Sequence, residues 1–175
     1  MPGQAGERQE EMSNKIKILP FHRELLNPET KCVPAFGHDD DACLDCYAME
    51  AFELPPFPDG SVGQAAYPVK LGFGVRMPRR TIWDVLTRKH WHAEVTGRSS
   101  QNKAGVLVMR GIVDEGYEGE IIAVLVNFNR HPVKYEKGDR ICQLLFDKCR
   151  RVSGDGIKTL IKEDRKDGGF GSTGK

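Results

Sequence analysis

The sequence predicts an all-β fold, most simply a jelly roll or a related sandwich with at most one short helix. Three observations support this prediction. Several short segments place apolar residues at every second position, which is typical of half-buried strands. Gly and Pro together account for 29 of the 175 residues (19 and 10), which favours many short elements separated by turns. Only one segment has the three- and four-residue apolar spacing of a helix.

The first half of the chain is expected to contain a disordered arm and three strands. The polar, glycine-containing segment Met1–Asn14 has too few apolar residues to fold by itself. Lys15–Pro20 alternates lysine with isoleucine and is predicted to be the first strand. Cys43–Phe52 and Val69–Met77 are predicted to be the next two. The segments between them are rich in Pro, Gly and Asp, which favour loops.

A helix is predicted over Thr81–Lys89, with Thr81 as a suitable N-cap. The apolar residues at helical spacing are Ile82, Val85 and Leu86. His90–Thr96 returns to the alternation of a strand, in which His90 and His92 share a face. We expect that face to be a solvent-exposed edge.

The second half is predicted to form two β-hairpins. The segments Gly105–Val113 and Glu120–Phe128 flank a tight Asp-Glu-Gly corner, which predicts that they pair with each other. Val133–Tyr135 and Arg140–Phe146 flank a Lys-Gly-Asp turn and make the second predicted hairpin. Apolar residues within Lys148–Ile161 suggest one last strand. The predicted organisation is an arm over 1–14, a β domain over 15–161 and a mobile, glycine-rich tail over 162–175.

The composition excludes several classes of partner. Lys and Arg number 26 and Asp and Glu 25, so the net charge of +1 provides no basic excess for nucleic-acid binding. The longest apolar run, Ile121–Val126, is far shorter than the ~20 residues of a membrane span, and Met1–Glu11 lacks the apolar stretch of a secretory signal. Five cysteines, an odd number, imply no disulfide framework. These features predict a cytoplasmic protein, of a cell or of a virus-infected host.

Five short segments carry side chains suited to a phosphorylated ligand. The arginine and serines of Gly97–Ser100 suit phosphate oxygens, and the carboxylates of Asp40–Ala48 suit a hard cation such as Mg²⁺. Gly111–Glu120 presents a carboxylate and a tyrosine at one corner, and Lys137–Leu144 leads from a turn into an apolar strand with one glutamine. Gly168–Lys175 offers glycine amides, two hydroxyls and a lysine. Each segment alone is as readily a turn or a linker, and the last lacks the hydroxyl residue, strand and helix that a P-loop needs.

Taken in order, the five segments resemble the five motifs of the homotrimeric dUTP pyrophosphatases (dUTPases), from Lys15 to the C-terminus. Gly111–Glu120 and the terminal GGFGSTG are the most specific of them. The resemblance implies a homotrimer in which all three subunits contribute to each active site. It also implies cleavage of dUTP to dUMP and pyrophosphate with Mg²⁺, which keeps uracil out of DNA and supplies dUMP for dTTP synthesis.

The resemblance assigns roles to individual residues. Asp114 would activate the attacking water, Tyr117 would pack on the deoxyribose and exclude a 2′-hydroxyl, and Asp45 would reach Mg²⁺ through water. The other residues expected to bind substrate are Arg98, Ser99, Ser100, Gly111 and Gln143, together with Arg165, Phe170, Gly171, Ser172 and Thr173 of the tail. The tail would close over the nucleotide as a lid, with Phe170 stacked on the base.

The sequence departs from the family pattern at several places. Cys43 stands where the first motif usually has glycine, and the short spacing from Arg98 to Asp114 favours the absence of the helix that often follows the second motif. Arg110 precedes the corner that reads the base, so a switched or dual preference for dCTP is an alternative. The insertion Thr81–Trp91 has no family counterpart, and the non-enzymatic alternative is a regulatory protein partner bound through it, as in some phage members.

Two further alternatives involve other chemistry. The related dCTP deaminases share this fold but use a glutamate on the strand after the third motif, where this chain has Val124. Cys43 and Cys46 have C-x-x-C spacing, but no second pair or histidine couple completes a zinc site. The run Asp39–Asp41 is expected to be a solvated turn.

Overall fold

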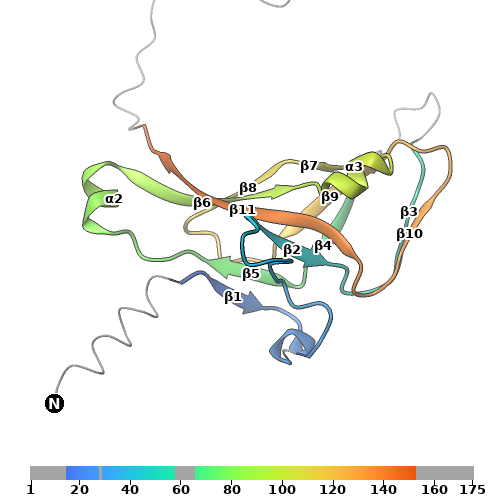
Figure 1. Cartoon of the computed structure of the whole chain (residues 1–175), viewed down its shortest axis with the longest axis horizontal. Helices are drawn as coiled ribbons and strands as arrows, with labels where there is room; N and C mark the ends of the chain where they lie inside the picture. The colour runs from blue at the N-terminus through green and yellow to red at the C-terminus, as the bar shows by residue number, and fades with distance from the viewer. Residues whose placement is uncertain (1–14, 28, 58–65, 153–175) are drawn as a thin grey trace, which may run out of the picture.

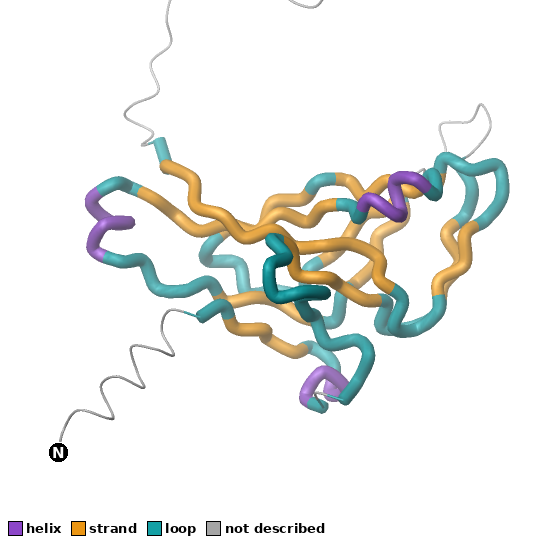
Figure 2. Tube along the Cα trace, in the orientation of Figure 1, coloured by secondary structure: helices purple, strands orange, loops and turns teal. Residues whose placement is uncertain are grey.

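Eleven β-strands dominate the part of the chain that the computed structural model describes, residues 15–27, 29–57 and 66–152 (Figure 1). Seven of them belong to a four-stranded and a three-stranded sheet, and the other four form two-stranded sheets (Figure 2). The predicted all-β class is therefore confirmed. None of the helices in these residues is long and apolar enough to cross a membrane.

The four-stranded sheet is antiparallel and carries most of the residues of interest. In spatial order its strands are β2 (Cys43–Tyr47), β11 (Arg140–Arg150), β6 (Lys89–Thr96) and β8 (Gly111–Asp114). Ala93 and Val95 of β6 are buried, so the alternating residues His92, Glu94 and Thr96 lie on the outer face.

The three-stranded sheet supplies the other wall of the core. Its strands, in order, are β4 (Tyr67–Lys70), β9 (Ile122–Asn127) and β7 (Val106–Met109). Buried side chains of both sheets belong to one apolar cluster, and its largest fully buried members include Phe73, Leu71, Leu125, Ile141 and Leu144. This core fixes the two sheets relative to each other and thereby positions the loops between them.

The small sheets complete the fold. β1 (Lys17–Pro20) pairs with β5 (Phe73–Arg76), β3 (Phe52–Leu54) pairs with β10 (Val133–Tyr135), and a 3₁₀ turn, η1, covers Arg23–Leu26. The segment predicted as one strand over Val69–Met77 is instead split into β4 and β5. Gly72 has a φ of +75°, and a Cβ there would lie 2.8 Å from Cγ of Met49, so only glycine suits this turn.

The first predicted hairpin is confirmed for only part of its length, and the second predicted pairing is wrong. Arg110 interrupts the first segment, so β7 pairs with β9 while β8 crosses to the other sheet and pairs with β6. In the second case β10 pairs with β3, and β11 pairs with β2 and β6. Among the described residues the last strand is β11, which runs to Arg150. Residues 153–161 of the predicted Lys148–Ile161 strand lie outside the described residues, as do the arm over 1–14 and the tail over 162–175.

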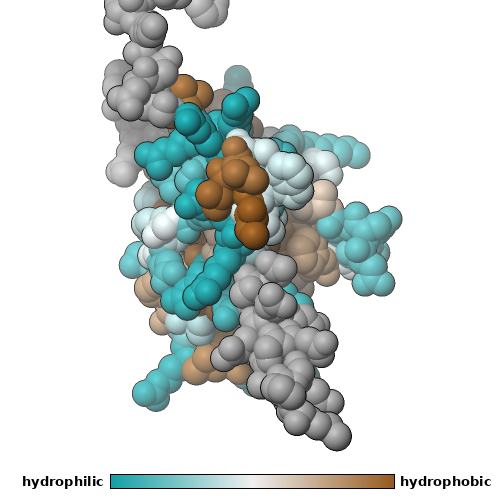
Figure 3. All heavy atoms as spheres, turned by 90° about the vertical axis from the view of Figure 1, so that its left-hand side faces the viewer, coloured by the Kyte–Doolittle hydropathy of each residue, from teal (hydrophilic) through white to brown (hydrophobic). Residues whose placement is uncertain are grey.

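The described residues hold two short α-helices, one more than the sequence predicted. α2 (Ile82–Leu86) begins after Thr81, whose side chain forms the expected cap. Its four apolar residues are exposed rather than buried, and the buried residue is Asp84. Figure 3, which faces this end of the molecule, shows a hydrophobic patch among hydrophilic residues. The second helix, α3 (Ser99–Lys103), was expected to be absent. Gln101 holds it in place, because its buried side chain donates to the Arg140 carbonyl at 3.0 Å.

Candidate active site

A buried carboxylate organises the residues of the first, second and fourth motifs. Asp45 on β2 is 3 % exposed. Its Oδ1 accepts hydrogen bonds from Arg98 Nε at 2.9 Å and from Gln143 Nε2 at 3.0 Å, and its Oδ2 accepts one from Arg140 Nη1 at 3.2 Å. Three of the roughly four acceptor positions of the carboxylate are thus used. Burying it is tolerable because it is paired with two guanidiniums.

These donors come together for local structural reasons. Gln143 lies directly opposite Asp45 in the β2–β11 ladder, and residues opposite each other share a face of the sheet. Arg98 lies between β6 and α3, and its Nη1 donates to Ser100 Oγ at 3.4 Å. Ser99 and Ser100 are exposed beside it. Two guanidiniums and one carboxylate leave one net positive charge, which suits a phosphate.

Arg140 is a member of this cluster that the sequence analysis did not identify. In a regular strand Arg140 and Gln143, three residues apart, would point to opposite faces. A bulge between Arg140 and Cys142 adds one residue to β11, so Arg140 reaches the same face as Asp45. The local alternation of the sequence carries no signal for this bulge.

The third motif forms a corner after β8 that presents Asp114 to solvent. The Tyr117 backbone N–H donates to the Asp114 carbonyl at 3.0 Å, and the Tyr117 hydroxyl donates to the Glu120 carbonyl at 3.0 Å. The tyrosine ring lies over Gly119, where a Cβ would come within 2.6 Å of its Cζ and Oη atoms. Gly119 therefore leaves the room that this ring position needs.

A pocket of about 230 Å³ lies under this corner. It is lined by Gly111, Asp114 and Tyr117 among the predicted site residues, and by Val95, Ile112, Val113, Glu120, Ile121 and Ile122. The Arg110 side chain does not line it. Arg110 Nη2 instead bonds Glu94 on β6, and both residues line a different cavity. This hydrogen bond raises the pKa of Arg110 and lowers that of the Glu94 carboxyl, so the pair remains ionised.

The corner and the donor cluster lie on the same face of the sheet but far apart. Asp114 is opposite His92 and Gln143 is opposite Thr96, so all four side chains point outward. From the strand geometry, the two positions are separated by roughly 13 Å along β6 and about 10 Å across the strands. One chain therefore does not bring Asp114 and Gln143 to a single phosphate.

The other expectations for the site divide into two groups. Arg165, Phe170, Gly171, Ser172 and Thr173 lie outside the described residues, so their role stays a prediction. Cys43 and Cys46 are three residues apart on a strand and point to opposite faces, with Cys46 fully buried. Within the described part of the chain no group of three or more His, Cys, Asp or Glu side chains is placed to hold a metal ion.

The prediction of an exposed edge at His90 and His92 is wrong. β6 is an inner strand between β11 and β8, and the two imidazoles are 23 % and 13 % exposed. His90 Nδ1 contacts Glu115 at 2.8 Å, and His92 Nε2 contacts Glu94 at 3.3 Å. Each histidine thus has a carboxylate neighbour on the outer face.

The fold and this site define an all-β protein that carries an acidic corner and, apart from it on the same sheet face, a cluster of cationic donors suited to phosphate. Comparison with known proteins makes the class specific. A family model described as dUTPase matches residues 30–174. The chain is 32 % identical over 160 residues to the deoxyuridine 5′-triphosphate nucleotidohydrolase of Gloeothece citriformis (strain PCC 7424), which covers 91 % of this chain and 97 % of that protein. This chain belongs to the dUTPase family.

Solved structures agree on the fold. A mutant of the phage 80alpha dUTPase superposes with a TM-score of 0.66 at 18 % identity, over 93 % of this chain and 100 % of that chain. A mutant dUTPase from phage phi11 of S. aureus superposes with a TM-score of 0.63 at 14 % identity, over 87 % and 100 %. That structure is described as revealing the coordination of a structural Mg(II) ion.

Proposed function

We propose that this chain hydrolyses dUTP to dUMP and pyrophosphate, as a dUTP diphosphatase. Membership of the dUTPase family supports the reaction. The observation that supports roles for particular residues is their position on one face of the four-stranded sheet. Asp114 lies at one end of this face, and the donors that bind Asp45 lie at the other. Such hydrolysis keeps uracil out of DNA and supplies dUMP for dTTP synthesis.

Asp114 is the proposed catalytic residue. It is exposed at the end of β8, beside the pocket, where its carboxylate can accept a proton from a water molecule. The oxygen of that water forms a bond to the α-phosphorus in line with the bond to the bridging oxygen, which breaks. Pyrophosphate leaves with the bonding electron pair, and the proton passes from Asp114 to solvent.

The pocket explains how the corner would select the nucleoside. Gly111 lies at its wall and leaves backbone groups accessible for the base. Tyr117 is the proposed deoxyribose contact, and its ring fills the space that a 2′-hydroxyl would need. Arg98, Ser99, Ser100 and Gln143 are proposed to hold the triphosphate. The tail residues Arg165, Phe170, Gly171, Ser172 and Thr173 are proposed to cover it as a lid.

Mg²⁺ is the proposed cofactor, carried by the phosphates of the substrate. Asp45 does not fit as a direct ligand, because three hydrogen bonds occupy its oxygens and it is 3 % exposed. One remaining acceptor position fits a contact through water, and Mg²⁺ commonly keeps several waters while binding one carboxylate and substrate phosphates. The ion would neutralise charge on the phosphates.

A homotrimer with shared sites is proposed for the assembled enzyme. The α-phosphorus and the γ-phosphate of one nucleotide are only two bridging oxygens apart, whereas Asp114 and Gln143 of one chain are much farther apart than that. A complete site therefore needs Asp114 from one subunit and the donors from another. Exposed apolar side chains on β7, β8 and β9 offer a surface for this contact: Leu107, Met109, Ile112 and Ile122, which are 44–55 % exposed.

The position of Arg110 removes the main argument for dCTP as the preferred substrate. That argument required Arg110 to lie near the base, but its side chain is paired with Glu94 and does not line the 230 Å³ pocket. Deamination is disfavoured for a separate reason, because Val124 has no acid–base group. We therefore expect dUTP to be strongly preferred over dCTP, dTTP and UTP.

A regulatory protein partner at Thr81–Trp91 also remains a proposal, as does a cytoplasmic location. α2 exposes Ile82, Trp83 and Leu86 (82, 74 and 68 %), which makes it suited to apolar contact. A variant with these three residues replaced by serine should keep dUTP hydrolysis and lose any regulatory partner. If a partner identified with the wild type bound this variant equally well, the proposal would be wrong.

The experiment that tests the function is pyrophosphate release from a panel of nucleotides with Mg²⁺. Purified protein is supplied with dUTP, dCTP, dTTP and UTP at equal concentrations, and initial rates are compared. We expect dUTP to give the highest kcat/KM by a wide margin. A preference for dCTP would contradict the substrate assignment, and release of phosphate instead of pyrophosphate would contradict attack at the α-phosphorus.

A further inference from the structure

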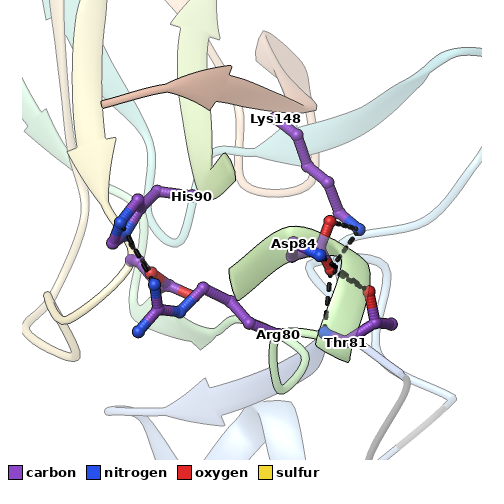
Figure 4. Close-up of polar contacts among 6 residues, drawn as sticks. Arg80, Thr81, Asp84, His90 and Lys148 are labelled. Atoms are coloured by element: carbon purple, nitrogen blue, oxygen red, sulfur yellow. Dashed lines mark hydrogen bonds and ion pairs between the residues drawn. The ribbon is translucent and has the colours of Figure 1, made fainter. Parts of the chain in front are cut away.

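A network outside the nucleoside pocket joins the ends of the Thr81–Trp91 insertion to the corner that carries Asp114 (Figure 4). His90 contacts Glu115 through Nδ1 at 2.8 Å and Arg80 through Nε2 at 3.2 Å. Arg80 Nε also lies 3.7 Å from Glu115 Oε1. The three side chains form a closed ring of contacts, and Glu115 directly follows Asp114 in the chain.

The chemistry of arginine fixes the proton positions in this ring. A guanidinium has only N–H donors, so His90 Nε2 accepts from Arg80 through its lone pair. The proton of the neutral imidazole then lies on Nδ1 and is donated to Glu115. A second proton on Nε2 would remove the bond from Arg80 and place two cations 3.2 Å apart. The ring is complete only while His90 is neutral.

Arg80 is held at a fixed position because the insertion is anchored to β11. Lys148 Nζ donates to both carboxylate oxygens of Asp84, at 2.9 and 2.8 Å, and lies 4.4 Å from the centre of the Trp91 ring. Thr81 donates to Asp84 from its backbone N–H at 2.9 Å and from its hydroxyl at 2.8 Å. Arg80 immediately precedes this cap. Figure 4 shows the two clusters side by side at the start of α2.

Other charged and titratable groups lie near the ring of Arg80, His90 and Glu115. They line the adjacent cavity of about 730 Å³: His92, Glu94, Arg110, Asp114, Cys149 and Arg151. Cys149 lies opposite His90 on β11, and Glu94 is paired with Arg110. Glu115 takes its counter-charge from Arg80, which leaves Asp114 exposed beside it.

We propose that Arg80, His90 and Glu115 form a positioning clamp for Asp114. The proposal rests on the catalytic role given to Asp114 above. Glu115 adjoins the carboxylate in sequence, so fixing its side chain limits the rotation of the backbone that aims Asp114.

Two other contacts fix the part of the corner that follows Tyr117, and neither of them reaches the residues next to Asp114. Glu118 accepts from Arg76 Nε at 2.6 Å, and Glu120 accepts from the Gly72 N–H at 3.1 Å. Both tie down the chain beyond Tyr117. Glu115 provides the corresponding tie next to the reacting group, where an error of about 1 Å can lower a rate as much as 100-fold.

The decisive variants are His90→Gln and His90→Leu, measured by kcat and KM. Glutamine has an acceptor oxygen and an NH₂ donor group, whereas leucine has neither. At pH 8 we expect His90→Leu to lower kcat about tenfold with KM within twofold, and His90→Gln to stay within twofold of wild type.

Arg80→Leu is the second variant, because it breaks the ring from an exposed position without altering β6. It should reproduce the loss of kcat seen in His90→Leu. Wild-type kcat in both leucine variants at pH 8, or a loss of kcat in His90→Gln as large as in His90→Leu, would overturn the clamp. Asp114→Asn is measured beside them: turnover in that variant would refute the role of Asp114, whereas its inactivity together with normal leucine variants would refute the clamp alone.

Discussion

At the scale of single residues, Gly119 determines where the Tyr117 ring can lie. A Cβ at this position would be 2.6 Å from the ring, so Gly119→Ala must displace Tyr117. We expect the ratio of kcat/KM for dUTP over UTP to fall about tenfold, because the 2′-hydroxyl then meets less steric exclusion. Gly116→Ala is the matched control, since a Cβ there meets nothing within 4 Å. An unchanged ratio in Gly119→Ala would remove Tyr117 from the selection of the sugar.

Site residues differ in how far the sequence could identify them. Asp45, Arg98 and Gln143 were predicted from their motifs, and they come together in the structure. Arg140 was missed, because only a bulge brings it to the same face. Glu115 was seen merely as part of a turn. Its contact with His90 depends on how β8 is placed beside β6, which no local pattern encodes.

At the scale of secondary structure, α2 depends on one partly buried ion pair rather than on its apolar residues. A five-residue helix has almost no stability of its own, and here Asp84 provides both the capping box and the contact with Lys148. The Lys148 hydrogen bond, followed by those from Thr81, lowers the pKa of the Asp84 carboxyl to about 2. The folded state therefore favours the ionised form.

The sign of the resulting pH dependence follows from that shift. The stabilisation from Asp84 is complete above its ordinary pKa of 3.8 and is lost as the pH falls through about 2. Asp84→Asn should be less stable than wild type at pH 7, and the difference should shrink between about pH 4 and 2. Urea unfolding at several pH values measures this difference. A gap that stays constant down to pH 2 would show that ionisation of Asp84 does not matter, and Glu50→Gln, at an exposed position, controls for loss of a surface charge.

Elements were easier to predict than their partners. Alternation in the sequence located most strands, including β1, β6 and β9, because each keeps one face in the core. Which strands pair with each other is not determined by the local sequence. The predicted strand is interrupted at Arg110, and the part after it, β8, pairs in the four-stranded sheet rather than with β9. α3 was missed for a similar reason. Its sequence, Ser-Ser-Gln-Asn-Lys, has no apolar period, and Gln101 fixes it through a contact with distant β11.

At the scale of the whole molecule, the proposed homotrimer would let each chain supply parts of two different sites. The outer face of the four-stranded sheet holds the corner proposed to activate water and the donors proposed to bind phosphate, with a spacing that one nucleotide cannot bridge. A cyclic assembly would solve this, because a heterologous interface can place the corner of one copy against the donors of the next. The exposed apolar residues near the corner would be covered by the same contact.

Mixing two inactive variants tests this arrangement. Asp114→Asn lacks the corner carboxylate and Arg98→Gln lacks a phosphate donor, so neither should turn over dUTP alone. If each site takes Asp114 from one subunit and Arg98 from its neighbour, every mixed trimer has one site with both residues intact. Random reassembly of equal amounts should then restore about one quarter of the wild-type activity, because three-quarters of the trimers are mixed and each has one good site in three. Mass in solution and melting temperature confirm that both variants assemble. If both residues of a site came from the same chain, mixing would restore nothing, and a stable, fully active monomer would refute the shared site outright.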